Sequence, residues 1–196
     1  MHINSKQILR AEMMRCLKIS SPTPVHDEGK AACRLLRGVS LWSRYGTILL
    51  FLSTPGEIDT GYLFEAAVGE GKKIFVPRTR GGRLVFCRVF DPAGPWERGP
   101  FGIREPPEKA EPLKPRDFPV LAVVPGLAFD PAGTRLGRGG ACYDRFFAGE
   151  SGPCCKIGFC GERQILPRLP ADPWDVPMDA LCTGSRFILI AEPPRE

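Results

Sequence analysis

The amino-acid sequence predicts an α/β protein in which one mixed β-sheet is covered by helices. Short apolar runs such as 47–52 and 120–124 fit buried strands, and they alternate with segments whose apolar residues recur at helical spacing. Over 47–76 a strand, a helix and a strand follow one another with short links, which predicts a parallel pair and a right-handed crossover. A length of 196 residues suits one domain, so residues 1–196 are expected to fold as a single unit.

Helices are expected where apolar residues share one helical face. The first follows Ser5, a good N-cap, and its inward face is formed by Leu9, Met13, Cys16 and Leu17. A second helix is expected over 27–43. A third is expected to begin at Asp59 or Thr60 and to end at Gly71. A short fourth helix is expected over 143–147.

Strands are expected at 47–52, 73–76, 83–89, 120–124, 156–159 and 186–190. Between them, the stretch 90–119 contains eight prolines and no pattern of a regular element. Such a long connection indicates either a functional excursion or a domain boundary. We favour the excursion, because the strands on both sides fit one sheet.

Composition and charge exclude several classes of protein. The charged fraction of 25% and hydrophobic fraction of 43% are those of a globular chain rather than a disordered one. No apolar run approaches the roughly 20 residues that span a bilayer, and no secretory signal is present, so a cytoplasmic protein without membrane contact is expected. The net charge of +5 suits anionic ligands. The basic residues form no tract or motif typical of nucleic-acid binding, so no nucleic-acid partner is expected.

The eight cysteines do not indicate a zinc site or a disulfide framework. No C-x-x-C pair occurs, and both histidines, His2 and His26, lie near the N-terminus. We interpret the cysteines as reduced thiols that act as small core residues. Cys142 is the exception to examine, because it ends a glycine-rich segment.

The segment from Arg135 to Arg145 has the composition of an anion-binding loop. Three glycines within four residues let backbone N–H groups approach a ligand, and Arg135 and Arg138 add bidentate donors suited to phosphate. A helix start follows directly, and its dipole favours an anion. The segment is neither a P-loop nor a dinucleotide fingerprint, and a surface turn with two solvated arginines is the alternative. For Lys6 and Arg10, four residues apart on the first helix, periodicity alone favours a solvated basic patch.

The wider pattern resembles the 5-formyltetrahydrofolate cyclo-ligase (methenyltetrahydrofolate synthetase) family. The central similarity runs from Val123 through Asp130 and Gly133 to the glycine-rich segment. Weaker matches occur in the right order along nearly the whole chain: Lys6-x-x-x-Arg10, 57–60, 71–78, 101–106, Gln164 and 175–183.

This resemblance implies a sheet arrangement like that of sugar-phosphate isomerases and CoA transferases. It also implies an ATP- and Mg²⁺-dependent conversion of 5-formyltetrahydrofolate to 5,10-methenyltetrahydrofolate with release of ADP and phosphate. In this reaction the formyl oxygen attacks the γ-phosphate, and N10 then attacks the formyl carbon. The expected substrate is 5-formyltetrahydrofolate, with one or more glutamates in its tail, and the enzyme is expected to act as a monomer.

Residue by residue, the resemblance assigns Arg138 as the catalytic group nearest the transferring phosphoryl group. It assigns Asp144 and Asp179 as Mg²⁺ ligands. The implied ATP-binding residues are Lys6, Arg10, Arg135, Leu136, Gly137, Arg138, Gly139, Gly140, Ala141, Cys142 and Tyr143. The implied substrate-binding residues are Leu52, Glu57, Phe101, Arg138 and Cys142, with Glu57 holding the pterin ring.

The chain departs from the family pattern inside the glycine-rich segment. The family usually reads G-R-G-G-G-Y-Y-D or G-R-G-K-G-Y-Y-D, whereas Ala141 and Cys142 stand here before Tyr143 and Asp144. Ala141 adds a methyl group where the backbone is expected to need a positive φ, and Cys142 replaces an aromatic residue. These changes favour two alternatives: a divergent paralogue that binds ATP but acts on another substrate, and a nucleotide-binding module without turnover.

Overall fold

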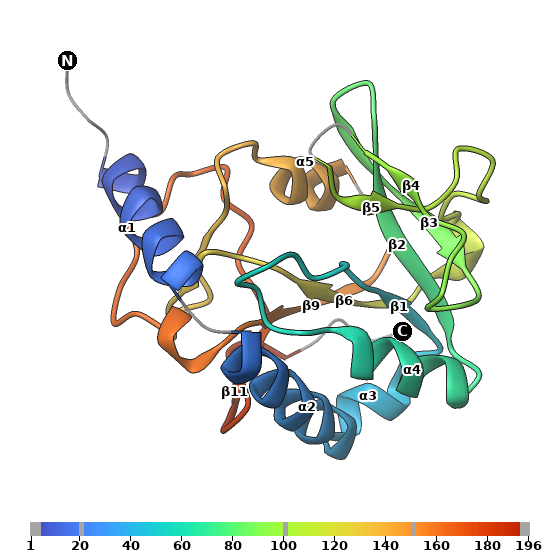
Figure 1. The fold of residues 1–196 in the computed structure, drawn as a ribbon, viewed down its shortest axis with the longest axis horizontal. Coiled ribbons are helices and arrows are strands. Elements are labelled where there is room, and N and C mark those ends of the chain that lie inside the picture. Colours follow the sequence, from blue (N-terminus) through green and yellow to red (C-terminus); the bar gives the residue numbers. More distant parts are fainter. Residues whose placement is uncertain (1–4, 20–21, 100–101, 150–151, 193–196) are drawn as a thin grey trace.

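The computed structural model describes residues 5–19, 22–99, 102–149 and 152–192. Within these ranges, seven strands form one mixed sheet in the order β11-β10-β9-β6-β1-β2-β3 (Figure 1). Neighbouring strands from β10 to β2 are parallel, and the edge strands β11 and β3 are antiparallel. The strands are β1 (Thr47–Leu49), β2 (Lys73–Arg80), β3 (Arg83–Val89), β6 (Val120–Val124), β9 (Cys154–Phe159), β10 (Ala180–Cys182) and β11 (Phe187–Leu189).

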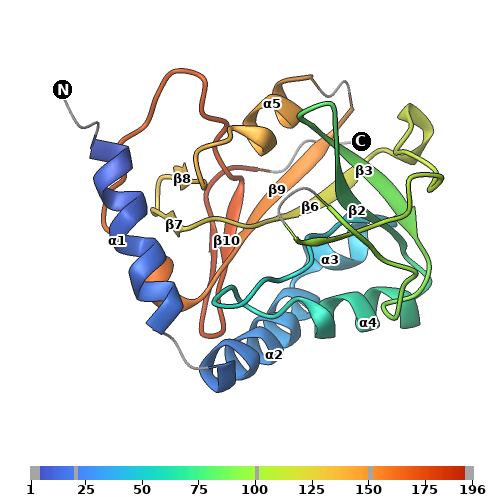
Figure 2. The same ribbon diagram turned by 45° about the horizontal axis from the view of Figure 1, so that its top comes forward.

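Helices cover both faces of the sheet, which confirms the predicted three-layer α/β domain. Three of them, α2 (Pro22–Gly38), α3 (Ser40–Arg44) and α4 (Gly61–Gly69), lie along one face, and α5 (Cys142–Gly149) lies on the other (Figures 1 and 2). Helix α1 (Ser5–Ile19) stands at one end of the sheet, beside the short pair β7 (Ala128–Phe129) and β8 (Arg135–Leu136) (Figure 2).

Three apolar clusters hold these layers together. On the α2–α4 face, Leu36, Phe64 and Phe159 belong to one cluster, and on the α5 face Phe86 and Phe129 belong to the second. All five residues of β6 are buried, because this central strand is covered on both faces. The third cluster packs Leu9, Met13 and Leu17 of α1 against Leu127, Leu136 and Leu169. It therefore fixes α1 beside the segment that leads into α5.

Several expected boundaries were wrong by a few residues. The helix expected over 27–43 is two helices, because Val39 adopts an extended conformation with ψ 146° between α2 and α3. The strand expected over 47–52 ends at Leu49. The expected start of α4 at Asp59 or Thr60 is confirmed: Thr60 is the N-cap residue, but its hydroxyl donates to the Phe51 carbonyl, and the Asp59 carboxylate accepts the Gly61 N–H at 2.8 Å.

Short elements were missed by the periodicity. Strand β10, only three residues long, lies between β9 and β11. The proline-rich stretch contains the pair β4 (Glu97–Arg98) and β5 (Arg104–Glu105) and the 3-10 turn η1 (Pro115–Asp117), and a further 3-10 turn, η2, spans Glu162–Gln164. These short elements are held by their neighbours, and they lack the continuous apolar run that made β1 and β11 predictable.

The cysteines are free thiols, and most of them lie in the core. Burial raises the pKa of Cys155 and of Cys182 to about 12, so these thiols remain protonated. Within the described ranges, every helix is too short or too polar to cross a lipid bilayer.

Gly158 provides a test of the packing around β9. A Cβ atom at this position in β9 would lie 2.6 Å from Phe129 Cε1 and 2.7 Å from Leu181 Cδ2, both in fully buried side chains. Gly158→Ala is expected to lower the free energy of unfolding by about 1–3 kcal/mol, measured by denaturant titration. Gly38→Ala is the matched control, because a Cβ atom there would meet no atom within 4 Å. Equal stability of the two variants would contradict the tight contact of Gly158 with Phe129.

Candidate active site

Within the glycine-rich segment, residues 137–141 form a loop that connects β8 to α5 at the end of the sheet where α1 stands (Figure 2). Strand β8 pairs with β7, and the buried side chain of Leu136 anchors it in the cluster with α1. Gly139 has a φ of 107° and Ala141 a φ of 47°. The expected positive φ at Ala141 is therefore confirmed, and the loop keeps a left-handed residue there although alanine replaces glycine.

Arg135 lies beneath this loop rather than on its surface. Its side chain is 5% exposed, and its Nη2 donates to Asp144 Oδ2 at 2.7 Å. The guanidinium carbon lies 5.5 Å from the centre of the Tyr143 ring. A Cβ atom on Gly137 would come within 2.9 Å of Arg135 Nη1, so the glycine leaves room for the guanidinium. Arg135 thus ties β8 to the first turn of α5.

Arg138 and Glu57 are 81 residues apart in the sequence and in direct contact in the structure. Arg138 Nη2 donates to Glu57 Oε1 at 2.8 Å and to Thr54 Oγ1 at 3.3 Å. The other carboxylate oxygen of Glu57 accepts the Thr54 N–H at 2.9 Å. The Arg138 side chain is 54% exposed, so its remaining donors can reach a ligand, whereas Glu57 is 11% exposed. Leu52 is half-buried and lies, like Thr54 and Glu57, in the connection between β1 and α4.

Lys6 and Arg10 make different contacts. Arg10 Nε donates to the Gly137 carbonyl at 3.0 Å, which places α1 against the glycine-rich segment. Lys6 is 5% exposed, and its Nζ donates to Asp172 Oδ2 at 2.7 Å and to Asp175 Oδ2 at 2.5 Å. Burial alone would lower the pKa of Lys6, but the hydrogen bonds and charges of the two carboxylates raise it above 10.5. Lys6 therefore remains charged and joined to the segment after β9.

The two residues predicted to bind Mg²⁺ contact different basic side chains. Asp144 pairs with Arg135, and its Oδ1 accepts the Val176 N–H at 3.2 Å. Asp179 Oδ2 accepts the Lys156 N–H at 2.7 Å and pairs with Lys156 Nζ at 2.9 Å. Across the described ranges, no three His, Cys, Asp or Glu side chains gather into a cluster that could hold a metal ion. The described chain thus offers single carboxylates rather than a dedicated metal cage.

The proline-rich stretch lies beside β2. Phe101, predicted to contact substrate, lies outside the described residues. Glu105, in the same proline-rich stretch, is buried and accepts the Thr79 N–H at 3.2 Å, which holds β5 against the end of β2. The stretch is therefore part of the same domain, as expected from the strands that flank it.

Two buried polar residues position the site, although their role could not be read from the sequence. Gln164 Nε2 donates to the Gly126 carbonyl at 2.7 Å and fixes the turn that follows β6. Asp130 accepts three backbone N–H groups, those of Ala132, Thr134 and Leu169. Both residues lie within matched motifs, which was the only available signal.

The fold and the loop define a three-layer α/β protein with a glycine-rich loop at the strand ends. The sequence model of the 5-formyltetrahydrofolate cyclo-ligase family matches residues 2–184. The chain belongs to this family and is thus an enzyme of the ligase class with a folate substrate, as the motifs indicated.

Individual relatives agree with this assignment. The chain is 31% identical over 144 residues to the 5-formyltetrahydrofolate cyclo-ligase of Escherichia coli strain K12, covering 71% of this chain and 79% of the relative. The cyclo-ligase of Haemophilus influenzae is 26% identical over 188 residues, covering 94% and 100%. Among solved structures, the 5,10-methenyltetrahydrofolate synthetase of Aquifex aeolicus superposes with a TM-score of 0.81 at 29% identity, covering 97% and 95%.

The buried contact of Lys6 leads to a pH-dependent prediction. Lys6→Met leaves two partly buried carboxylates without their cation and is expected to lower the free energy of unfolding by about 2 kcal/mol at pH 7. Because the pKa of Lys6 is raised on folding, its contribution is fully present below 10.5 and is lost as the pH rises above that value. The difference between the two proteins, measured by urea unfolding at several pH values, should therefore shrink above pH 10.5. A difference that stays constant there would contradict the ion pair.

Proposed function

We propose that this protein converts 5-formyltetrahydrofolate and ATP to 5,10-methenyltetrahydrofolate, ADP and phosphate, acting as a monomer. The observation that carries the proposal is the contact between Arg138 of the glycine-rich loop and Glu57 of the connection between β1 and α4. The Arg138 guanidinium is suited to phosphate, and the Glu57 carboxylate is suited to the amino-pyrimidine edge of a pterin. Their contact would bring a phosphoryl donor and a folate together.

The reaction activates an otherwise unreactive formyl amide. The formyl oxygen attacks the γ-phosphorus of ATP, and the bond from that phosphorus to ADP breaks. N10 of the folate then attacks the formyl carbon and loses its proton, and the carbon–oxygen bond breaks as phosphate leaves. The tasks left to the protein are positioning and neutralisation of charge, as in other phosphoryl transfers.

The residues around the loop suit these tasks. Backbone N–H groups from Gly137 to Cys142, together with the start of α5, would hold the phosphates. Arg138 would neutralise the transferring group, since more than half of its side chain is exposed. Arg10, fixed against Gly137, would add charge beside the loop. Arg135 is buried with Asp144, so its support of the phosphates would act through the position of the loop.

Mg²⁺ would supply charge neutralisation at the phosphates, with Asp144 and Asp179 as its proposed protein ligands. Mg²⁺ in such sites typically takes one or two carboxylates and completes its shell with phosphate and water oxygens. Asp144 lies at the start of α5, directly after the loop. Both assignments rest on the family resemblance, because Arg135 and the Val176 N–H engage the Asp144 carboxylate and Lys156 engages that of Asp179.

A second candidate is a relative that binds ATP but acts on another substrate or on none. Cys142 favours it, because the cysteine replaces an aromatic residue beside the predicted substrate site. Ala141 argues against a damaged nucleotide loop, since the positive φ is kept. The two candidates differ in one respect: only the first requires folate for the release of ADP.

The deciding experiment follows two signals on the purified protein with 5-formyltetrahydrofolate, ATP and Mg²⁺. One is the absorbance of the methenyl product, and the other is the release of ADP. We expect both to rise together, to require the folate and to stop when Mg²⁺ is chelated. ATP binding without folate-dependent product would select the second candidate.

Arg138→Ala is expected to lower kcat by at least about 100-fold, because a donor aimed at transition-state charge is lost. The chain should remain folded, since Arg138 is exposed, and circular dichroism checks this. Arg34→Ala is the matched control, an exposed arginine on α2 at the opposite face of the sheet. Wild-type turnover in Arg138→Ala would refute the proposed role of the loop.

A further inference from the structure

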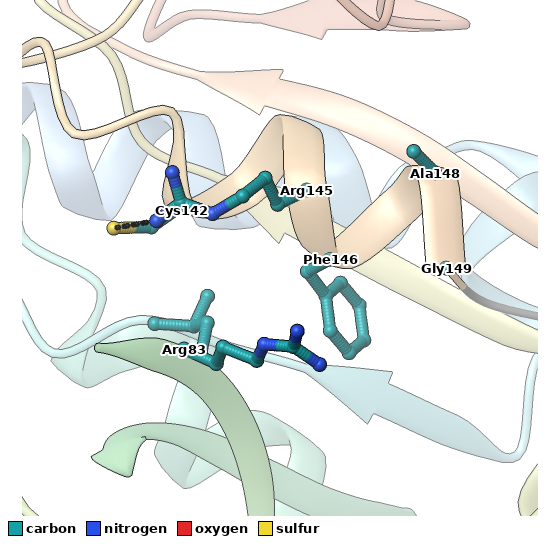
Figure 3. Close-up of a pocket in the computed structure, with 7 residues that line it drawn as sticks. Arg83, Cys142, Arg145, Phe146, Ala148 and Gly149 are labelled. Carbon is teal, nitrogen blue, oxygen red and sulfur yellow. Dashed lines mark hydrogen bonds between the residues drawn. The ribbon is translucent and has the colours of Figure 1, made fainter. Parts of the chain in front are cut away.

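A pocket of about 450 Å³ lies between α5 and the hairpin formed by β2 and β3. One wall is formed by Arg83 and Leu84 at the start of β3, and the other by residues of α5, among them Cys142, Arg145 and Phe146 (Figure 3). Two arginines and no acidic residue line it. None of the predicted site residues except Cys142 takes part in the pocket.

The walls are held by contacts between α5 and the hairpin. The Phe146 ring packs against Phe86 of β3 with 4.7 Å between ring centres. Arg145 Nη2 donates to the Gly82 carbonyl at 3.3 Å and lies 3.8 Å from Cys142 Sγ. Figure 3 shows the Arg145 side chain directed toward Cys142 and the Arg83 side chain beneath the Phe146 ring. The two guanidinium groups therefore lie on opposite walls, with an apolar surface between them.

This combination has a defined ligand chemistry. Leu84 and Phe146 suit an aromatic or aliphatic group, and two guanidinium groups suit carboxylates, which they bind by paired hydrogen bonds. An aromatic ring joined to a dicarboxylate meets both requirements. The p-aminobenzoyl-glutamate part of a folate is such a group.

The pocket also adjoins the glycine-rich loop. Cys142 is both the end of the glycine-rich segment and a lining residue of the pocket. Arg138, proposed to neutralise the phosphoryl group transferred to the formyl oxygen, precedes Cys142 by four residues in the same glycine-rich segment, so a folate bound there would have the pocket beside it. An aromatic side chain in place of Cys142 would occupy this opening, whereas the thiol leaves it free.

We propose that this pocket binds the p-aminobenzoyl-glutamate tail of the folate substrate, with Arg83 and Arg145 pairing with its carboxylates. The inference rests on the proposed function for the identity of the ligand. It adds a binding site and assigns a role to two residues, Arg83 and Arg145, that were not among the predicted site residues. The affinity should also fall as salt is raised, because both arginines are exposed.

The test uses p-aminobenzoyl-triglutamate, which lacks the pterin and the formyl group, and measures its binding by isothermal titration calorimetry at low salt. We expect wild type to bind it, and Arg83→Ala and Arg145→Ala each to weaken it about three- to tenfold. Arg83→Glu should weaken it further by reversing a charge on a residue that lies away from the glycine-rich segment. Arg34→Ala is the control and should bind like wild type.

Turnover separates this proposal from the proposed function. For triglutamyl 5-formyltetrahydrofolate, KM should rise in Arg83→Ala while kcat changes little, and the preference over 5-formyltetrahydropteroate, which has no glutamate, should diminish. If wild type forms no methenyl product but the arginine variants still weaken binding of the fragment, the proposed function fails and the pocket stands. Equal fragment affinity in all proteins, no binding to wild type, or displacement of the fragment by ATP alone would each overturn the pocket proposal.

Discussion

The buried ion pair between Arg135 and Asp144 is the contact on which the candidate site depends. It joins β8 to the first turn of α5, and the five residues between Leu136 and Cys142 must bridge these two fixed ends. Both side chains are mostly excluded from water, and removal of one partner from such a pair costs about 3–5 kcal/mol. The loop is thus held at both ends, so that its N–H groups can be set before a ligand arrives. Such preorganisation is the main contribution that a protein makes to charge stabilisation.

Helix α1 holds the same loop from outside. Its apolar face is buried against Leu136, and its basic residues contact two different segments: Arg10 the loop at Gly137, and Lys6 the carboxylates of Asp172 and Asp175. A helix that the sequence suggested as a phosphate-binding surface therefore also connects the loop to the segment after β9. Helix α1 therefore both adds positive charge beside the loop and fixes the position of the loop.

The sequence was sufficient for the layers of the fold but not for its shortest parts. Runs such as Val120–Val124 are buried on both faces, and so they are visible as continuous apolar stretches. Strand β10 is three residues long and is defined by its neighbours β9 and β11, which local periodicity cannot show. In the site, motif similarity brought Arg138 and Glu57 into consideration, and their contact could be seen only in the structure. The acidic partners of Lys6 are more than 160 residues distant, and no pattern near Lys6 indicates them.

The two departures from the family pattern, adjacent in sequence, have different physical consequences. Ala141 takes a positive φ that glycine would adopt at less cost, so its effect is confined to the backbone and the loop keeps its shape. Cys142 changes the side chain at the border between the loop and the pocket beside α5, where Arg145 is its neighbour. A change that preserves the loop and opens the space next to it alters the fit of a substrate more than the binding of a nucleotide. Under the proposed function, divergence in this chain is therefore expected in the recognition of the folate tail rather than in the glycine-rich loop.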